Sequence, residues 1–142
     1  GTTALDAIIF KVTTDGVLTW SLRIAGDRGD MFSNIFVDSS GIYAFGNTQS
    51  TMTKGYIDLL QTKSSLDGAE VYTKTMGGTG SEIGTDIAFF ESFEYICGHS
   101  GSITSVDGEI GLSDNDLNDI FVLKLKRSSL TRVWGKFIGD SQ

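Results

Sequence analysis

The stretch DIFVLKLKRSSLTRVWGKFIG, residues 119–139, decides the fold that this sequence predicts. Successive side chains of an extended strand point to opposite faces, so its opening run places Ile120 and Val122 on one face and Phe121 and Leu123 on the other. A sheet with one face in water would instead alternate apolar and polar residues. The strand therefore predicts a small sheet that is covered by neighbours on both sides.

Two earlier segments, which begin at Asp6 and Asp58, align with the segment that begins at Asp119. Each has a Lys five positions after the Asp, an aromatic residue nine or ten positions after that Lys, and a Gly fifteen positions after the Lys. These residues are Lys11, Trp20 and Gly26, then Lys63, Tyr72 and Gly78, then Lys124, Trp134 and Gly139. Such a recurrent spacing indicates a repeat architecture.

Between the three units lie two further segments, 33–48 and 84–100, each of which predicts a strand, a short turn and a second strand. Turns such as TTDG at 13–16 and SLDG at 65–68 separate the strands within the units. The sequence has 18 glycines, no proline and no sustained helical periodicity. We therefore predict an all-β chain whose four-stranded antiparallel sheets stack face to face, as the blades of a β-propeller do.

The pieces FVDSSGIYAFGNT and DLLQTKSSLDGAEVYTKTMGG resemble the SBBP-type β-propeller repeat and, more loosely, NHL-type blades. The resemblance implies that residues 1–142 are a partial β-propeller, with an outer half-blade at 6–25 and blades at 33–77 and 84–138. About two and a half blades make an incomplete ring, because a propeller closes with four or more. We expect the chain to be a fragment of a longer propeller, or to complete its ring with other copies.

The charge of the chain excludes some classes of partner. Its formal net charge is −7, and no dense cluster of Lys and Arg interrupts the acidity. Nucleic acids and anionic membranes both require a concentrated positive surface, so we expect neither as a partner. No apolar run approaches the roughly 20 residues of a membrane span, which argues against membrane insertion. The single cysteine, Cys97, excludes an internal disulfide framework and permits a reducing compartment. The compartment itself stays open at this point, with a secreted or cell-surface location favoured.

The loop GDRGD, residues 26–30, contains the tripeptide Arg28-Gly29-Asp30, which many adhesion ligands present to integrins. Two interpretations are open. The tripeptide is a binding loop, or the glycine and the acid serve the turn that joins one repeat to the next. The repeat favours the turn, because Asp30 aligns with Glu82 and only Arg28 is peculiar to this copy.

The polar segment 105–119 offers a candidate metal site. Asp114, Asp116 and Asn118 have the i, i+2, i+4 spacing of oxygen ligands at the start of a calcium loop. The sixth position is an acid instead of Gly, and the twelfth is Leu125 instead of a bidentate Glu. The alternative is a solvated polar loop that carries no ion.

The function predicted from these observations is a non-enzymatic propeller module for protein–protein interaction or structural assembly. Antiparallel strands bring the loops 26–32, 48–57, 78–83 and 99–118 to one side, where we expect protein partners to bind. No catalytic residues and no obligatory cofactor are predicted, with calcium as the one candidate ion. The alternative function is a carbohydrate- or calcium-dependent adhesion domain at a cell surface.

Overall fold

The computed structural model describes residues 4–50, 55–101 and 119–139, and these residues form ten β-strands and no helix. This confirms the prediction of an all-β chain. The strands are β1 (Ala7–Val12), β2 (Leu18–Ile24), β3 (Asp30–Asp38), β4 (Gly41–Thr48), β5 (Asp58–Ser64), β6 (Glu70–Met76), β7 (Glu82–Phe90), β8 (Phe93–Ser100), β9 (Asp119–Lys126) and β10 (Arg132–Ile138).

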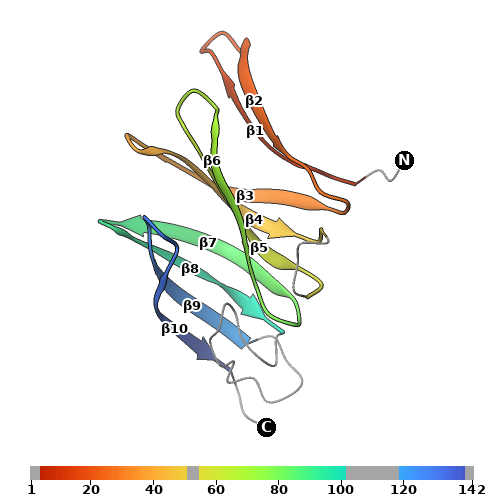
Figure 1. Cartoon of the computed structure of the whole chain (residues 1–142), viewed down its shortest axis with the longest axis vertical. Helices are drawn as coiled ribbons and strands as arrows, with labels where there is room; N and C mark the ends of the chain where they lie inside the picture. The colour runs from red at the N-terminus through yellow and green to blue at the C-terminus, as the bar shows by residue number, and fades with distance from the viewer. Residues whose placement is uncertain (1–3, 51–54, 102–118, 140–142) are drawn as a thin grey trace.

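The strands form three antiparallel sheets, in which each strand pairs with its neighbours in sequence. We call them the N-terminal sheet (β1–β2), the middle sheet (β3–β6) and the C-terminal sheet (β7–β10). None of the three closes on itself. Figure 1 shows them following one another along the long axis of the molecule. Two inter-repeat loops are shorter than predicted, because β3 begins at Asp30 and β7 at Glu82.

Tight turns with glycines at positive φ join β1 to β2, β3 to β4 and β5 to β6, whereas in the C-terminal sheet the turn residues at positive φ are Glu91 and Leu130. Gly16 and Gly68, at the ends of the predicted TTDG and SLDG turns, have φ values of 79° and 86°. Gly41, in the DSSG turn between β3 and β4, has a φ of 138°. Residues with a side chain rarely adopt this region, so the glycines let the chain reverse where the sequence pattern placed the turns.

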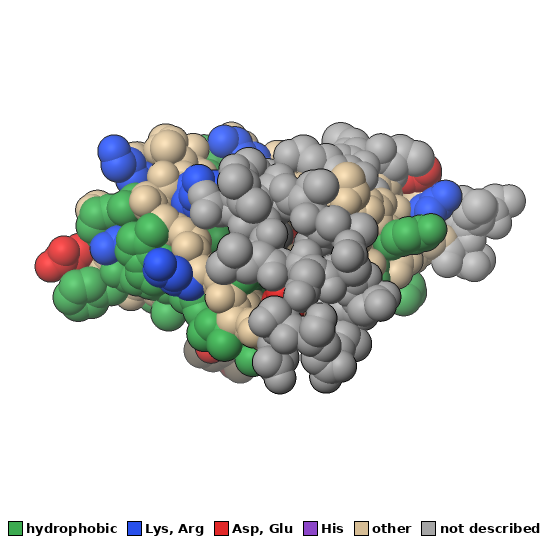
Figure 2. All heavy atoms as spheres, turned by 90° about the horizontal axis from the view of Figure 1, so that it is seen from below, with side chains coloured by type: hydrophobic (Ala, Val, Ile, Leu, Met, Phe, Trp, Pro, Cys, Tyr) green, Lys and Arg blue, Asp and Glu red, His purple; other side chains and the backbone are tan. Residues whose placement is uncertain are grey.

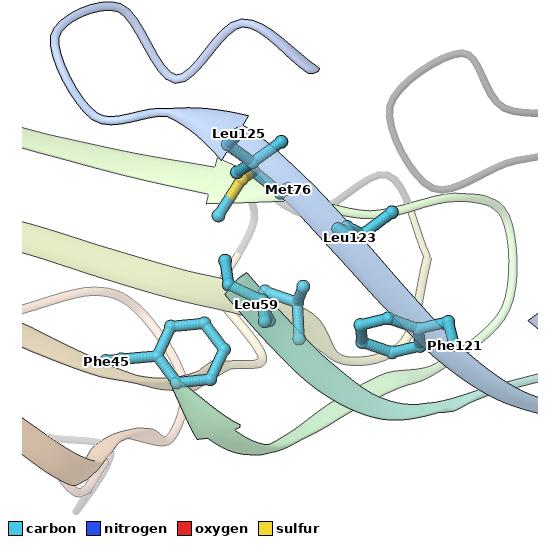
Figure 3. Close-up of a cluster of buried hydrophobic side chains, with 7 residues drawn as sticks. Phe45, Leu59, Met76, Phe121, Leu123 and Leu125 are labelled. Atoms are coloured by element: carbon cyan, nitrogen blue, oxygen red, sulfur yellow. The ribbon is translucent and has the colours of Figure 1, made fainter. Parts of the chain in front are cut away.

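The main core lies between the middle and C-terminal sheets. We define the front face of a sheet as the one turned towards the next sheet in the chain, and the back face as the one turned towards the previous sheet. In the N-terminal sheet the back face is the face opposite its front face, and in the C-terminal sheet the front face is the face opposite its back face. The front face of the middle sheet contributes buried apolar side chains from β4, β5 and β6, and the back face of the C-terminal sheet meets them from β8 and β9 (Figure 3). The core residues are Phe45, Leu59, Met76, Ile96, Phe121, Leu123 and Leu125.

A second, smaller core joins the N-terminal sheet to the middle sheet. Ile9 on the front face of the first packs with Ile42 and Ala44 on the back face of the second, and Trp20 and Leu22 pack against this group. The indole of Trp20 also covers the β5–β6 turn, since a Cβ built on Gly68 would lie 2.5 Å from the Trp20 ring. Both cores therefore join a front face to a back face.

Only the middle sheet is covered on both faces among the described residues. Contrary to the expectation from the 119–125 run, Ile120 on the front face of the C-terminal sheet is 54% exposed, while Phe121 on the back face is fully buried. On the back face of the N-terminal sheet, Phe10 is 63% exposed. The difference arises because each end sheet has a neighbouring described sheet on one side only.

A close backbone approach between β3 and β4 gives a first prediction. A Cβ added at Gly46 would lie 2.0 Å from the carbonyl oxygen of Met31 and 2.7 Å from the Cα of Phe32, both backbone atoms of the paired strand. We expect Gly46→Ala to lower the free energy of unfolding by about 2–3 kcal/mol, because β3 must shift to admit the methyl group. Urea unfolding monitored by tryptophan fluorescence measures the loss.

The matched control is Gly29→Ala. A Cβ there would meet only the Gln49 side chain, at 3.6 Å, which is ordinary contact. We expect a change within about 0.5 kcal/mol. Equal losses for Gly46→Ala and Gly29→Ala would mean that the β3–β4 approach does not control stability.

Candidate functional site

A hollow of about 370 Å³ lies between the starts of β3 and β7 and the end of β4. We call this end of the molecule, where the loops before β3, β5 and β7 lie, the loop end. Backbone hydrogen bonds fix its walls: Asp30 N donates to Leu5 O (2.7 Å), and Gln49 N donates to Gly29 O (2.8 Å). The lining is apolar on several sides, with two amide side chains among the polar groups. The lining residues are Leu5, Gly29, Asp30, Met31, Asn47, Gln49, Ile57 and Ile83.

Two further hydrogen bonds connect the hollow to the C-terminal sheet. Gly84 N donates to Asn47 Oδ1 (3.0 Å), and Glu82 N donates to Ile57 O (2.7 Å). Ile57 also forms an isolated parallel bridge with Ser81. The hollow is therefore built on two packed sheets, which makes it a concave site on a rigid support.

The first and last residues of the Arg28-Gly29-Asp30 tripeptide differ in their exposure to solvent. Arg28 is exposed, whereas Asp30 is the first residue of β3 and only 4% exposed. The Asp30 carboxylate accepts hydrogen bonds from Thr48 Oγ1 and from Ser50 Oγ, the latter at 3.0 Å to each oxygen. Adhesion through the tripeptide stays a prediction, and it would require the Asp30 carboxylate to leave these two hydroxyl groups.

The residue that aligns with Asp30 has a similar environment. Glu82 is fully buried at the start of β7, and its carboxylate accepts hydrogen bonds from Ser100 Oγ (2.9 Å) and from Gly78 N (2.6 Å). In each four-stranded sheet an acid at the start of the first strand thus bonds a hydroxyl group on the second strand. The Asp30–Glu82 alignment was the sequence signal for this anchoring role.

A cluster at the opposite end of the strands was missed by the sequence analysis. The guanidinium of Arg127, which follows β9, donates to Asp38 Oδ2 (2.5 Å) on the middle sheet. Its central carbon lies 4.3 Å from the ring centroid of Tyr43 and 4.9 Å from that of Phe89. The hydrogen bond from Ser40 Oγ, together with Arg127, lowers the pKa of Asp38 to about 2. The cluster joins the two four-stranded sheets.

A buried polar pair lies between these sheets in the main core. Gln61 Nε2 on the middle sheet donates to Glu94 Oε2 on the C-terminal sheet at 2.9 Å, and both residues are fully buried. Burial raises the pKa of Glu94 to about 7. The corresponding repeat positions in the smaller core hold Ile9 and Ile42, which pack together. The Gln61–Glu94 pair therefore occupies, in the main core, the position that the apolar Ile9–Ile42 contact occupies in the smaller core.

The remaining predictions concern a calcium site, the single cysteine and membrane insertion. The calcium candidates Asp114, Asp116 and Asn118 lie outside the described residues. Within the described ranges, no group of three or more His, Cys, Asp or Glu residues is placed to hold a metal ion. Cys97 is a free, half-buried thiol on β8. A helix long and apolar enough to cross a bilayer is not found in the part of the chain that the structure describes.

Comparison with known proteins adds no assignment. No protein-family model matches the chain, and no curated protein matches its sequence.

Proposed function

We propose that this chain is a non-enzymatic β-propeller module, about two and a half blades, that serves protein–protein interaction or structural assembly. The observation that carries the proposal is that equivalent faces pack in both cores. Front-face Ile9 packs on the next sheet's back face at Ile42, and front-face Leu59 belongs to the same core as back-face Phe121. Small antiparallel sheets that follow one another in this way are the building units of propellers.

The contact surface that we propose is the hollow at the loop end. Its size suits one or two inserted side chains of a partner, and its lining offers apolar contact from Met31, Ile57 and Ile83 with amide groups to fix orientation. The titratable group in this lining, Asp30, has its carboxylate bound by neighbouring hydroxyl groups. These features favour recognition of a protein segment over catalysis.

Site-specific photo-crosslinking tests this proposal. A photoreactive phenylalanine analogue at Gln49, an exposed residue in the lining, is expected to crosslink to discrete protein partners in cells that produce the chain. The same analogue at Leu66, which is exposed in the β5–β6 turn away from the loop end, is the matched control and is expected to give none of these products. Mass spectrometry identifies the products.

A second variant connects the crosslink to the hollow. Met31 is 57% exposed, so Met31→Asp places a charge in the lining without burying it in the core. We expect this change to reduce the Gln49 crosslink about tenfold or more, since a charge opposed to an apolar anchor weakens binding by at least about 1.4 kcal/mol. Similar products from both positions, or crosslinks that Met31→Asp leaves unchanged, would rule out the hollow as the contact surface.

A further inference from the structure

The front face of the C-terminal sheet is an apolar surface that no described part of the chain covers. Residues paired across its strands share this face, and among them Ile120 is 54%, Trp134 39% and Ile138 64% exposed. The Trp134 ring lies edge-on to Tyr95 at 6.3 Å, and Lys124 Nζ lies 3.9 Å above the ring of Phe93. Figure 2, which views the molecule from below Figure 1, shows exposed hydrophobic side chains with Lys and Arg among them.

The same positions in the other two sheets are interface positions. Ile120 corresponds in the repeat to Ala7 of β1 and Leu59 of β5. Ala7 is 2% exposed, and Leu59 is fully buried in the core that the middle sheet forms with the back face of the C-terminal sheet. Trp134 corresponds to Trp20, which packs against the middle sheet. The front face of the C-terminal sheet therefore has the composition of a face that receives another sheet.

The back face of the N-terminal sheet is a second exposed apolar face. On β1 it presents side chains that are 52%, 63% and 47% exposed. Their repeat equivalents on β9 are 0%, 1% and 3% exposed, because they form the main core against the middle sheet. The two sets are Ile8, Phe10 and Val12 on β1, and Phe121, Leu123 and Leu125 on β9. The N-terminal sheet thus presents apolar residues where the C-terminal sheet packs on its neighbour.

We propose that a second copy of this chain docks head to tail, with the back face of its N-terminal sheet on the front face of the first copy's C-terminal sheet. This inference rests on the proposed function as a β-propeller module, and it names a second copy of the chain as the partner of that module. It continues the front-to-back packing that both existing cores use, so the contact is heterologous: each copy contributes a different surface. Uncovered apolar faces of this kind are a recognised sign of an association site.

Sedimentation velocity and light scattering on the whole chain test the proposal. We expect the mean mass to rise above the monomer value of 15.3 kDa as the concentration increases. Phe10→Asp on the back face and Ile120→Asp on the front face are each expected to raise the dissociation constant about tenfold or more. Leu66→Asp, at an exposed apolar residue in the β5–β6 turn, is the matched control and is expected to associate like the unmodified chain.

Mixing the two variants distinguishes this geometry from a symmetric dimer. Phe10→Asp keeps an intact front face and Ile120→Asp an intact back face, so an equimolar mixture is expected to form a heterodimer at a concentration at which each variant alone is mainly monomeric. Ile8→Asp and Ile138→Asp, also at exposed positions, repeat the test if either first variant loses its circular dichroism spectrum.

Three outcomes would overturn the proposal: a chain that stays monomeric at all concentrations, variants that associate normally, or a mixture that fails to form the heterodimer. The first outcome would leave both sheet faces to a different occupant. Each outcome is independent of the Gln49 crosslink, so failure of this inference is distinguishable from failure of the hollow as a contact surface.

Discussion

Replacement of Phe121 by alanine is expected to lower the free energy of unfolding by about 3–5 kcal/mol, which is the usual loss when a fully buried Phe is truncated. Phe121 is 0% exposed in the main core, and its ring centroid lies 6.3 Å from that of Phe137. The ring also fills the space over Gly98, where an added Cβ would lie 2.8 Å from the Phe121 ring. Neighbours held in two sheets cannot collapse into the cavity without moving a strand.

The matched control is Phe10→Ala on the back face of the N-terminal sheet. Phe10 is 63% exposed, so its truncation is expected to change the free energy of unfolding by no more than about 0.5 kcal/mol in dilute, monomeric protein. Urea unfolding monitored by circular dichroism measures both variants. Similar losses for the two would mean that the packing between the middle and C-terminal sheets is not the main source of stability.

Glu94 is expected to make the protein less stable as the pH rises. The pKa of Glu94 is about 7 in the folded chain and 4.5 as the ordinary value, so the folded state retains a proton that the unfolded state has released. The resulting stabilisation is fully present below about pH 4.5 and is lost as the pH rises through about 7. The difference between the two pKa values corresponds to about 3 kcal/mol.

The Glu94→Gln variant tests this assignment, because an amide cannot ionise. Gln61 Oε1 has no hydrogen-bond partner among the described residues, and the amide introduced at position 94 could donate to it. We therefore expect the variant to keep its stability between pH 5 and pH 8, where the unmodified chain loses most of this contribution. Urea unfolding at the two pH values gives the comparison.

Asp38 supplies the internal reference for this experiment. Its pKa is lowered to about 2 from 3.8, so its contribution is present above about pH 4 and is lost only as the pH falls towards 2. It therefore adds no slope between pH 5 and pH 8. If the unmodified chain and Glu94→Gln lose the same stability over that interval, Glu94 is not the group that titrates.

Local patterns predicted much of the fold. The strand segments and the turns at Gly16, Gly41 and Gly68 follow from short runs of apolar residues and from glycine placement, which act over a few residues. Sequence reasoning placed the loops 26–32, 48–57 and 78–83 on one side, and these loops supply Gln49 and Ile83 of the lining, but it had no signal for the hollow itself or for the contribution of the distant Leu5. The Arg127–Asp38 ion pair was missed for the same reason, since 89 positions separate its partners.

The sequence by itself determined an all-β chain, the approximate strand positions and the recurrence of equivalent residues, because extended-strand periodicity and turn chemistry are local properties. Only the tertiary structure decided which apolar faces are covered: Phe121 is buried and Ile120 is exposed although both are apolar residues of one strand. It also decided that Asp30 bonds Thr48 and Ser50 instead of facing solvent. Burial depends on which sheet lies opposite, and strand alternation does not contain that information.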